Sequence, residues 1–466
     1  MFSKFLSSSK PALEKLLEEL LKRYEYASIL GTDYHIKNYV VRKTVTSVSD
    51  GPGTERGFVV RLNNGRSFFD YYFDSIPEDI GEIVKAIEGA VKLGEGLSDR
   101  QISPKAVLDE PLQKDFYREN DLADYKTEDI VSFLTSLKDQ VLARSDKVKD
   151  AFAVISTLET SKIFLSRSRR LTQNYVWVNG MLRIAYSDNN RMVGSRTGAN
   201  SHLLKDVFEN LPKTIDELLD KAAHLITAKP IVPGVYDIIT HPSITGLIAH
   251  EAFGHGVEMD QFVKDRAVAK EYVGKYVASP LINMHDGASA TLSAASYFFD
   301  DDGVLASDTL IIKDGILQTG ICDLVSSREL GTNPTGNGRR QSYRNKAYTR
   351  MTNTFFDEGE SKVEDMIASI KHGYMLFETN NGMEDPKNWA IQCVCEYGRE
   401  IIDGKLTDNY VSPVVISGFV LDLLKSISMV SKGKEIIGAG QCGKGYKEWV
   451  RVSDGGPYLK ARAKLS

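Results

Sequence analysis

Two histidines and a glutamate stand close together at residues 250–255, in the order His-Glu-Ala-Phe-Gly-His. Neutral imidazoles bind Zn²⁺, and an unligated carboxylate beside the metal can take a proton from a zinc-bound water, whose pKa the metal lowers toward ~7. His250 and His255 are therefore candidate zinc ligands, and Glu251 is a candidate general base. The alternative interpretation is that both histidines are ordinary polar residues at the end of a helix.

The spacing of the two histidines makes a demand on the backbone. In a regular α-helix, residues five apart differ by about 140° in direction, so His250 and His255 cannot both face one metal from an undistorted helix. Gly254 and Gly256 flank the second histidine, and glycine tolerates a bulge or an unwound helix end. We therefore expect the helix to be distorted at His255.

A catalytic zinc site also needs a third protein ligand beside its water. The residue types leave five candidates open, namely His241, Glu258, Cys393, Cys395 and Cys442. The chain has only 4 cysteines in 466 residues, which makes no disulfide framework. Any special role of a cysteine would therefore be metal ligation or nucleophilic chemistry.

Cys442 lies in a glycine-rich segment, residues 438–445, which matches G-x-G-x-x-G and nearly matches the P-loop pattern. Gly445 has no hydroxyl for Mg²⁺, and the roughly 20 residues that follow are too few for a dinucleotide-binding βαβ unit. Nucleotide binding is therefore disfavoured, and we expect a loop with Cys442 at its apex. A second glycine-rich loop at residues 331–340 ends in Arg339 and Arg340, and a solvent-exposed turn explains it equally well.

Helices and hairpins are predicted to alternate in the first half of the chain. Apolar periodicity over residues 13–21 indicates an amphipathic helix with Pro11 in its first turn, and further helices are expected near 80–87 and 130–141. Asn64-Gly65 and Asn179-Gly180 each lie between apolar strand-like runs, which predicts two hairpins. The first half is therefore expected to combine helices with a sheet.

The segment 229–234, Lys-Pro-Ile-Val-Pro-Gly, is the clearest linker signal in the sequence. We place a domain boundary there, with an N-terminal α/β domain at 1–228 and a C-terminal domain at 229–466. A short strand at 235–240 and a helix from about Ser243 follow the boundary. Beyond them, short apolar runs broken by Gly, Asn and Asp favour a mostly antiparallel β domain, so the fold class is α+β.

Charge and hydropathy restrict the partners. With 58 Lys and Arg against 63 Asp and Glu, the net charge is −5, and the interspersed signs favour no nucleic-acid partner. No apolar stretch reaches the ~18–20 residues of a membrane span, and the start of the chain lacks the apolar core of a signal peptide. We therefore expect a soluble, cytoplasmic protein without membrane contact.

Taken together, these motifs resemble the TldD/PmbA family, the modulator of DNA gyrase family of peptidases, over nearly the whole chain. The matching strings are His250-Glu-Ala-Phe-Gly-His-Gly-Val-Glu258, Pro334-Thr-Gly-Asn-Gly-Arg-Arg340, Arg350-Met-Thr-Asn-Thr354, Ser426-Ile-Ser-Met-Val430 and Cys442-Gly-Lys444. The chain is similar to the TldD type, which carries the H-E-x-x-x-H string that the PmbA (TldE) type lacks.

This resemblance implies His250, His255 and Cys442 as zinc ligands and Glu251 as the general base. It also implies an α/β N-terminal domain followed by a mostly β domain, and pairing with a PmbA/TldE-like subunit around an enclosed cavity that admits unfolded peptides. A homodimer is the alternative assembly.

The sequence thus predicts a zinc metallopeptidase that cleaves unfolded or extended peptides. Glu251 would deprotonate the zinc-bound water and then pass the proton to the leaving amine. The alternative function is a non-catalytic partner or scaffold subunit of a peptidase complex. Glu251 discriminates between the two, because a structural zinc site has no use for an unligated carboxylate beside two histidines.

Overall fold

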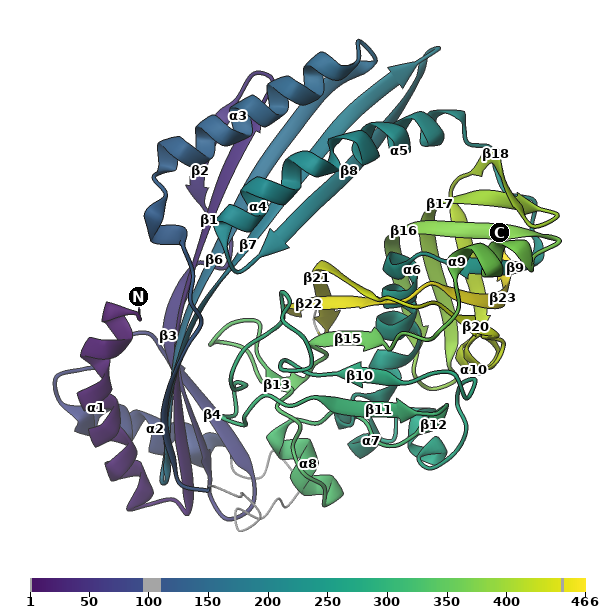
Figure 1. Cartoon of the computed structure of the whole chain (residues 1–466). Helices are drawn as coiled ribbons and strands as arrows, with labels where there is room; N and C mark the ends of the chain where they lie inside the picture. The colour runs from purple at the N-terminus through teal and green to yellow at the C-terminus, as the bar shows by residue number, and fades with distance from the viewer. Residues whose placement is uncertain (1, 95–109, 446–447) are drawn as a thin grey trace.

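The structure is a computed structural model, and it describes residues 2–94, 110–445 and 448–466. The first half of the chain forms one long, twisted sheet (Figure 1). Its strands are β1 (Tyr26–Arg42), β2 (Thr46–Asp50), β3 (Glu55–Asn63), β4 (Phe68–Phe73), β5 (Leu112–Tyr117), β6 (Val148–Ser166), β7 (Arg169–Asp188) and β8 (Arg191–Ser201).

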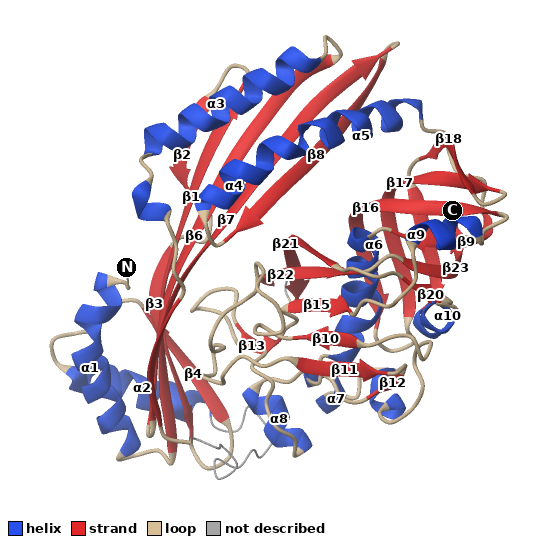
Figure 2. Ribbon diagram, viewed as in Figure 1, coloured by secondary structure: helices blue, strands red, loops and turns tan. Residues whose placement is uncertain are grey.

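The strand order in this sheet is β4-β3-β1-β6-β7-β5, with β2 added to β1 and β8 added to β7. The pairs are antiparallel except β5 with β7. Helices pack at its two ends (Figure 2). One end carries α1 (Lys4–Leu21) and α2 (Ile80–Gly94), and the other carries α3 (Thr127–Arg144), α4 (Leu204–Asn210) and α5 (Ile215–Thr227), with short 3₁₀ turns η2 (Leu122–Asp124) and η3 (Leu211–Thr214).

The hairpin predicted at Asn64-Gly65 is confirmed, since Asn63 pairs with Phe68 across it and Gly65 has a positive φ of 91°. The prediction for Pro11 is wrong in position. The helix begins at Lys4, where the Ser3 side chain accepts a hydrogen bond from the backbone N–H of Leu6, so Pro11 lies inside the helix. An N-cap serine is a stronger start signal than a proline eight residues later.

The hairpin predicted at Asn179-Gly180 is also wrong. Residues 169–188 form one unbroken strand, held by β6 on one side and β8 on the other. The chain turns instead at Asn189 and Asn190, both with positive φ. Gly180 serves a close approach, because a Cβ there would lie 2.6 Å from a side-chain carbon of Val207 on α4.

The second half of the chain builds two larger sheets and a two-stranded ribbon. The first has the order β12-β11-β10-β15-β22-β21, and the second has the order β16-β9-β23-β19-β17-β18 with β20 on β23. Their strands are β9 (Gly234–Thr240), β10 (Met284–Asp286), β11 (Thr309–Lys313), β12 (Ile316–Leu317), β15 (Asn353–Phe356), β16 (His372–Asp385), β17 (Ala390–Ile402), β18 (Lys405–Val411), β19 (Val414–Phe419), β20 (Met429–Val430), β21 (Glu435–Lys444), β22 (Glu448–Gly456) and β23 (Leu459–Leu465); the ribbon is β13 (Gly338–Arg339) with β14 (Tyr348–Thr349).

These sheets are antiparallel apart from the pairs β15 with β22 and β9 with β16, and the whole chain is therefore α+β. Short helices cover their margins. They are α7 (Asp260–Val263), η6 (Val268–Tyr272), α8 (Leu324–Leu330), α9 (Val363–Ala368) and α10 (Val420–Lys425).

One helical segment lies between the two sheets and positions the site. It runs from α6 (Pro242–Leu247) through η4 (Ile248–Gly254) to η5 (His255–Val257), and it contacts β15, β16 and β22. Its apolar side chains belong to the largest core cluster, together with residues of both sheets. Among the described residues, no helix has the length and apolar character needed to cross a bilayer.

Candidate metal centre

The two histidines of the motif are brought together by a π-helix. Residues Ile248–Gly254 adopt this wider helix, and the backbone N–H of His255 donates to the carbonyl of His250, which is its characteristic i→i+5 bond. A five-residue spacing then places His250 and His255 on one face. The predicted distortion is confirmed, but it begins at Ile248, before the first histidine.

The glycines around His255 serve close packing more than unusual dihedral angles. Gly254 has an ordinary helical φ of −58°, yet a Cβ there would lie 2.1 Å from the sulfur of Met351. A Cβ at Gly256 would lie 2.7 Å from side-chain atoms of both Glu384 and Trp389. The backbone of the motif can therefore lie against these side chains only because both positions lack a Cβ.

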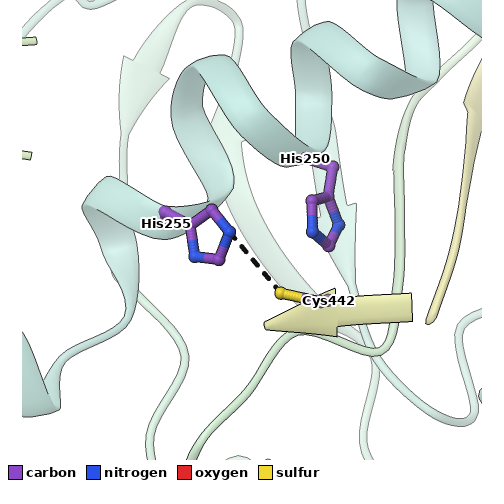
Figure 3. Close-up of side chains that lie close together, drawn as sticks. All are labelled: His250, His255 and Cys442. Carbon is purple, nitrogen blue, oxygen red and sulfur yellow. Dashed lines mark hydrogen bonds between the residues drawn. The ribbon is translucent and has the colours of Figure 1, made fainter. Parts of the chain in front are cut away.

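The imidazoles of His250 and His255 converge with the thiol of Cys442, which comes from β21 (Figure 3). The Sγ of Cys442 lies 3.5 Å from Nε2 of His255. The two rings are 5.3 Å apart and nearly perpendicular, at 84°. One donor atom from each of the three residues lies within 4.8 Å of the others, and within the described ranges no other three His, Cys, Asp or Glu side chains group in this way.

Of the five candidates for a third ligand, the structure brings only Cys442 into the group. His241 caps α6, where its Nδ1 accepts from the N–H of Ser243. Cys393 and Cys395 lie buried on β17, and burial raises the pKa of both thiols, that of Cys393 to about 12. Both are therefore held as neutral thiols.

The prediction that Cys442 sits at a loop apex is wrong. It lies within β21, directly opposite Val450 of β22. The glycine-rich segment therefore forms a strand with an irregularity between Ile437 and Gly440, and its glycines make neither a P-loop nor a dinucleotide-binding turn.

Electrostatic attraction links the three side chains. Burial opposes the charged form of each group, but the attraction between the Cys442 thiolate and the two imidazolium rings outweighs it. The pKa of Cys442 consequently falls well below its usual value, while the pKa of His250 rises to about 9 and that of His255 rises well above its ordinary range. The pocket thus stabilises a thiolate provided that positive charge lies next to it.

Glu258, which the sequence offered as a possible ligand, instead orients His255. Its Oε2 lies 3.2 Å from Nδ1 of His255, so Nε2 of that ring is left to face Cys442. Glu258 is 1% exposed, and the attraction of Lys444 and His255 outweighs burial and keeps its pKa well below the usual range. Carboxylate partners of this kind fix the orientation of histidine ligands in metal sites.

Lys444 and Arg350 complete this support, and reasoning from the sequence assigned neither of them a role. Nζ of Lys444 donates to Glu258 at 2.9 Å and to Asp260 at 2.7 Å. Arg350, which is 1% exposed, donates to the backbone carbonyl of Cys442 at 2.6 Å. Both residues lie in sequence strings that match the family, and that match was the one sign in the sequence that they have a role.

Glu251 lies beside the donor group. Its carboxylate oxygens are 4.0 Å from Nε2 of His250 and 3.8 Å from Nε2 of His255. The side chain is 21% exposed, so water can reach it. Gly382 of β16 leaves room for it, because a Cβ at that position would lie 2.6 Å from Cγ of Glu251.

The segment 331–340 is not the solvent-exposed turn that its composition allowed. Asn337 and Arg340 are buried. Arg340 donates to Asp70 of β4 at 2.8 Å, which connects this segment to the first sheet, and Arg339 donates to the carbonyl of Met351 at 2.7 Å. Both arginines therefore have structural contacts, and that of Arg339 reaches the residue packed on Gly254.

Comparison with known proteins gives the relatives of the chain. Residues 233–463 match the family model of the PmbA/TldA metallopeptidase C-terminal domain. The chain is 28% identical to a metalloprotease of Methanocaldococcus jannaschii over 97% of this chain and 99% of that protein. It is 30% identical to a zinc metalloprotease TldD homologue of Saccharolobus solfataricus over 55% of this chain and 57% of that one.

The crystal structure of TldE from Thermococcus kodakarensis superposes with a TM-score of 0.74 at 20% identity, covering 98% of this chain and all of that one. The fold is that of this solved structure, and the relatives matched by sequence carry metalloprotease names. The chain belongs to the TldD/PmbA family.

Proposed function

We propose that the chain is a zinc metallopeptidase in which His250, His255 and Cys442 hold the metal and Glu251 is the general base. The observation that carries the proposal is the convergence of two imidazoles and a thiolate beside a free carboxylate. The relatives named as metalloproteases, one of them a zinc metalloprotease, support it.

The donor set fits zinc. Bonds of ~2.0 Å to nitrogen and ~2.3 Å to sulfur at tetrahedral angles separate two such ligands by about 3.5 Å, and Sγ of Cys442 lies 3.5 Å from Nε2 of His255. The thiolate is already favoured in the protein. A cation that replaces the imidazole protons would keep the charge compensation the pocket needs.

When bound, Zn²⁺ supplies Lewis acidity toward a peptide carbonyl and lowers the pKa of water toward neutrality. Glu251 lies near both Nε2 atoms, where its carboxylate can accept a proton from water and return it to the leaving amine. Glu258 holds the proton at Nδ1 of His255, so Nε2 is available as a ligand.

The substrate we propose is an extended or unfolded peptide. β21 is the last strand of its sheet, and within the described residues its one strand partner is β22. Its outer edge can therefore pair with an added strand, which main-chain hydrogen bonds would hold next to Cys442. A folded domain, whose strands are already paired, would not bind in this way.

The partner we propose is a TldE-like subunit, since the fold matches that of TldE along nearly the whole chain. A homodimer is the alternative. Because TldE itself has this fold, the fold alone does not separate a catalytic subunit from a non-catalytic one, and Glu251 beside the donor group favours the catalytic role.

The test combines metal analysis with peptidase assays of the full chain, alone and mixed with a TldE-like subunit. We expect about one zinc per chain, together with cleavage of an unfolded peptide that stops after chelation and returns with Zn²⁺. The same peptide sequence inside a stable folded domain should resist cleavage. Absence of zinc, or cleavage that chelation leaves unchanged, would contradict the proposal.

A further inference from the structure

A cavity lies beside the β21–β22 pair that carries Cys442, and its chemistry differs from that of the candidate metal centre. It has a volume of about 380 Å³ and lies between the first sheet, which contributes Tyr34, Lys162 and Tyr175, and the β21–β22 pair, which contributes Gln441 and Arg451. Figure 1 shows β21 and β22 extending from the C-terminal sheets toward the long sheet. Gln441 immediately precedes Cys442, so the cavity and the metal centre share one strand.

The charged groups of the cavity leave an excess of positive charge. Lys162 pairs with Asp301, and Arg340 pairs with Asp70. Asp300 accepts hydrogen bonds from three backbone N–H groups, and burial, followed by the nearby Asp302, raises its pKa well above the usual value. The acidic groups are therefore paired, satisfied or held toward the neutral form.

Two guanidinium groups of the lining have no carboxylate partner among the described residues. Arg339 donates to the carbonyl of Met351 and stacks on Tyr297, with its guanidinium 5.6 Å from the ring centre. Arg451 has neither an ion pair nor a hydrogen-bond acceptor for its side chain in the described part of the chain. Burial, together with the nearby Arg339, lowers the pKa of Arg451, but a guanidinium remains charged at neutral pH.

Burying a cation without a nearby anion costs free energy, and a bound anionic ligand would offset that cost. We propose that this cavity binds a carboxylate of the peptide substrate, with Arg451 as its principal anchor and Arg339 beside it. The assignment to a peptide rests on the proposed peptidase function. Arginine suits the task because its planar fork can bind both oxygens of a carboxylate.

The position of Arg451 explains how one peptide could contact both the candidate metal centre and the cavity. Gln441 pairs with Arg451, and Cys442 pairs with Val450. Since side chains alternate along a strand, Gln441 and Arg451 project from the face opposite Cys442. A peptide added to the edge of β21 would likewise alternate, so a residue next to the cleaved bond can direct its carboxylate toward Arg451.

Binding can be followed without hydrolysis. The chain has 3 tryptophans, of which Trp449 lines the cavity and is 47% exposed, whereas Trp177 and Trp389 are buried. Tryptophan fluorescence of the full chain, with and without added Zn²⁺, therefore reports occupancy. Three peptides that share an otherwise uncharged sequence are titrated. Two are blocked at both ends and carry either Glu or Gln at the central position, and the third carries Gln and is blocked only at its N-terminus, so that its C-terminal carboxylate is free.

We expect the Glu peptide to bind about 10-fold more tightly than the Gln peptide, as a charge-assisted hydrogen bond predicts. A preference for the free C-terminus instead would identify the terminal carboxylate as the source and would support the same pocket. Arg451→Gln should abolish the preference, Arg451→Lys should keep part of it, and Arg66→Gln, at an exposed arginine of the β3–β4 turn, should leave it intact.

Equal affinity for all three peptides, no binding of any of them, or an unchanged preference in a folded Arg451→Gln protein would overturn the assignment. Testing whether each peptide is still intact after its titration distinguishes carboxylate binding in the cavity from the proposed peptidase activity. Selective binding without zinc-dependent cleavage, even after a TldE-like subunit is added, would contradict the peptidase and support the pocket. Cleavage without carboxylate preference would do the reverse.

Discussion

The Sγ atom of Cys442 lies 3.5 Å from Nε2 of His255, although 187 residues separate the two in the chain. One connected set of buried side chains holds both partners. Glu258 accepts a hydrogen bond from His255 and another from Lys444, which lies two residues after Cys442 in the chain. Arg350 donates to the backbone carbonyl of Cys442. The geometry of the donor group therefore depends on contacts between distant segments.

Replacing Cys442 with serine should lower zinc affinity by more than about 100-fold, because the loss of a ligand exceeds the 10- to 100-fold effect of losing a residue that orients one. Metal content after dialysis against a zinc buffer measures this. Cys395→Ala is the matched control, since Cys395 is equally buried but outside the group. Full occupancy in Cys442→Ser, or metal loss in Cys395→Ala, would move the third ligand elsewhere.

Glu258→Gln should weaken zinc binding about 10- to 100-fold while the three donor residues remain. The amide leaves His255 without its charged acceptor and Lys444 without one of its two carboxylates. Competition with a chromogenic chelator measures the affinity. Glu364→Gln, at an exposed glutamate of α9, should bind zinc like the wild type, and wild-type affinity in Glu258→Gln would refute the orienting role.

Gly254→Ala should destabilise the protein by about 1–3 kcal/mol, as overpacking of a tight core does. The new methyl group would collide with the sulfur of Met351. Met351→Ala removes that atom, so urea unfolding of the double variant should show less destabilisation than the sum of the single variants. Strict additivity would mean that Met351 is not what requires glycine at 254.

The sequence predicted part of the local structure at the histidine motif. The spacing of His250 and His255 was enough to require a distorted helix, because five residues do not fit one face of an α-helix. It could not distinguish a π-helix from an unwound helix end, since either would reorient the second histidine. The division at residues 228 and 229 stays a prediction.

The sequence alone also could not select the proposed third ligand. Residue chemistry left five candidates, and only the resemblance favoured Cys442, whose approach to His255 depends on strand pairing between β21 and β22. The prediction of a hairpin at Asn179-Gly180 was wrong for a related reason. Neighbouring strands on both sides keep β7 extended and override a local turn signal.

Stability should fall as the pH rises above about 6.5, the usual histidine pKa, through the titration of His285. Hydrogen bonding to Asp357 raises the pKa of His285, against burial and with help from Asp308. A raised pKa stabilises the fold while the ring is charged, and this contribution is lost as the pH rises through the folded-state pKa.

Urea midpoints at pH 6 and pH 9 test this contribution. The fall between them should be smaller in His285→Gln, and also in Asp357→Asn, which removes the main partner. An undiminished fall in both variants would show that His285 is not its source.

Glu251→Gln gives the most direct test of the account, measured as zinc content and peptide turnover on the same preparation. The carboxylate lies beside both Nε2 atoms without belonging to the donor group. The variant should therefore retain about one zinc per chain and lose at least about 100-fold in kcat, the scale of general-base catalysis. Turnover near the wild-type level with zinc bound would contradict the proposed peptidase mechanism.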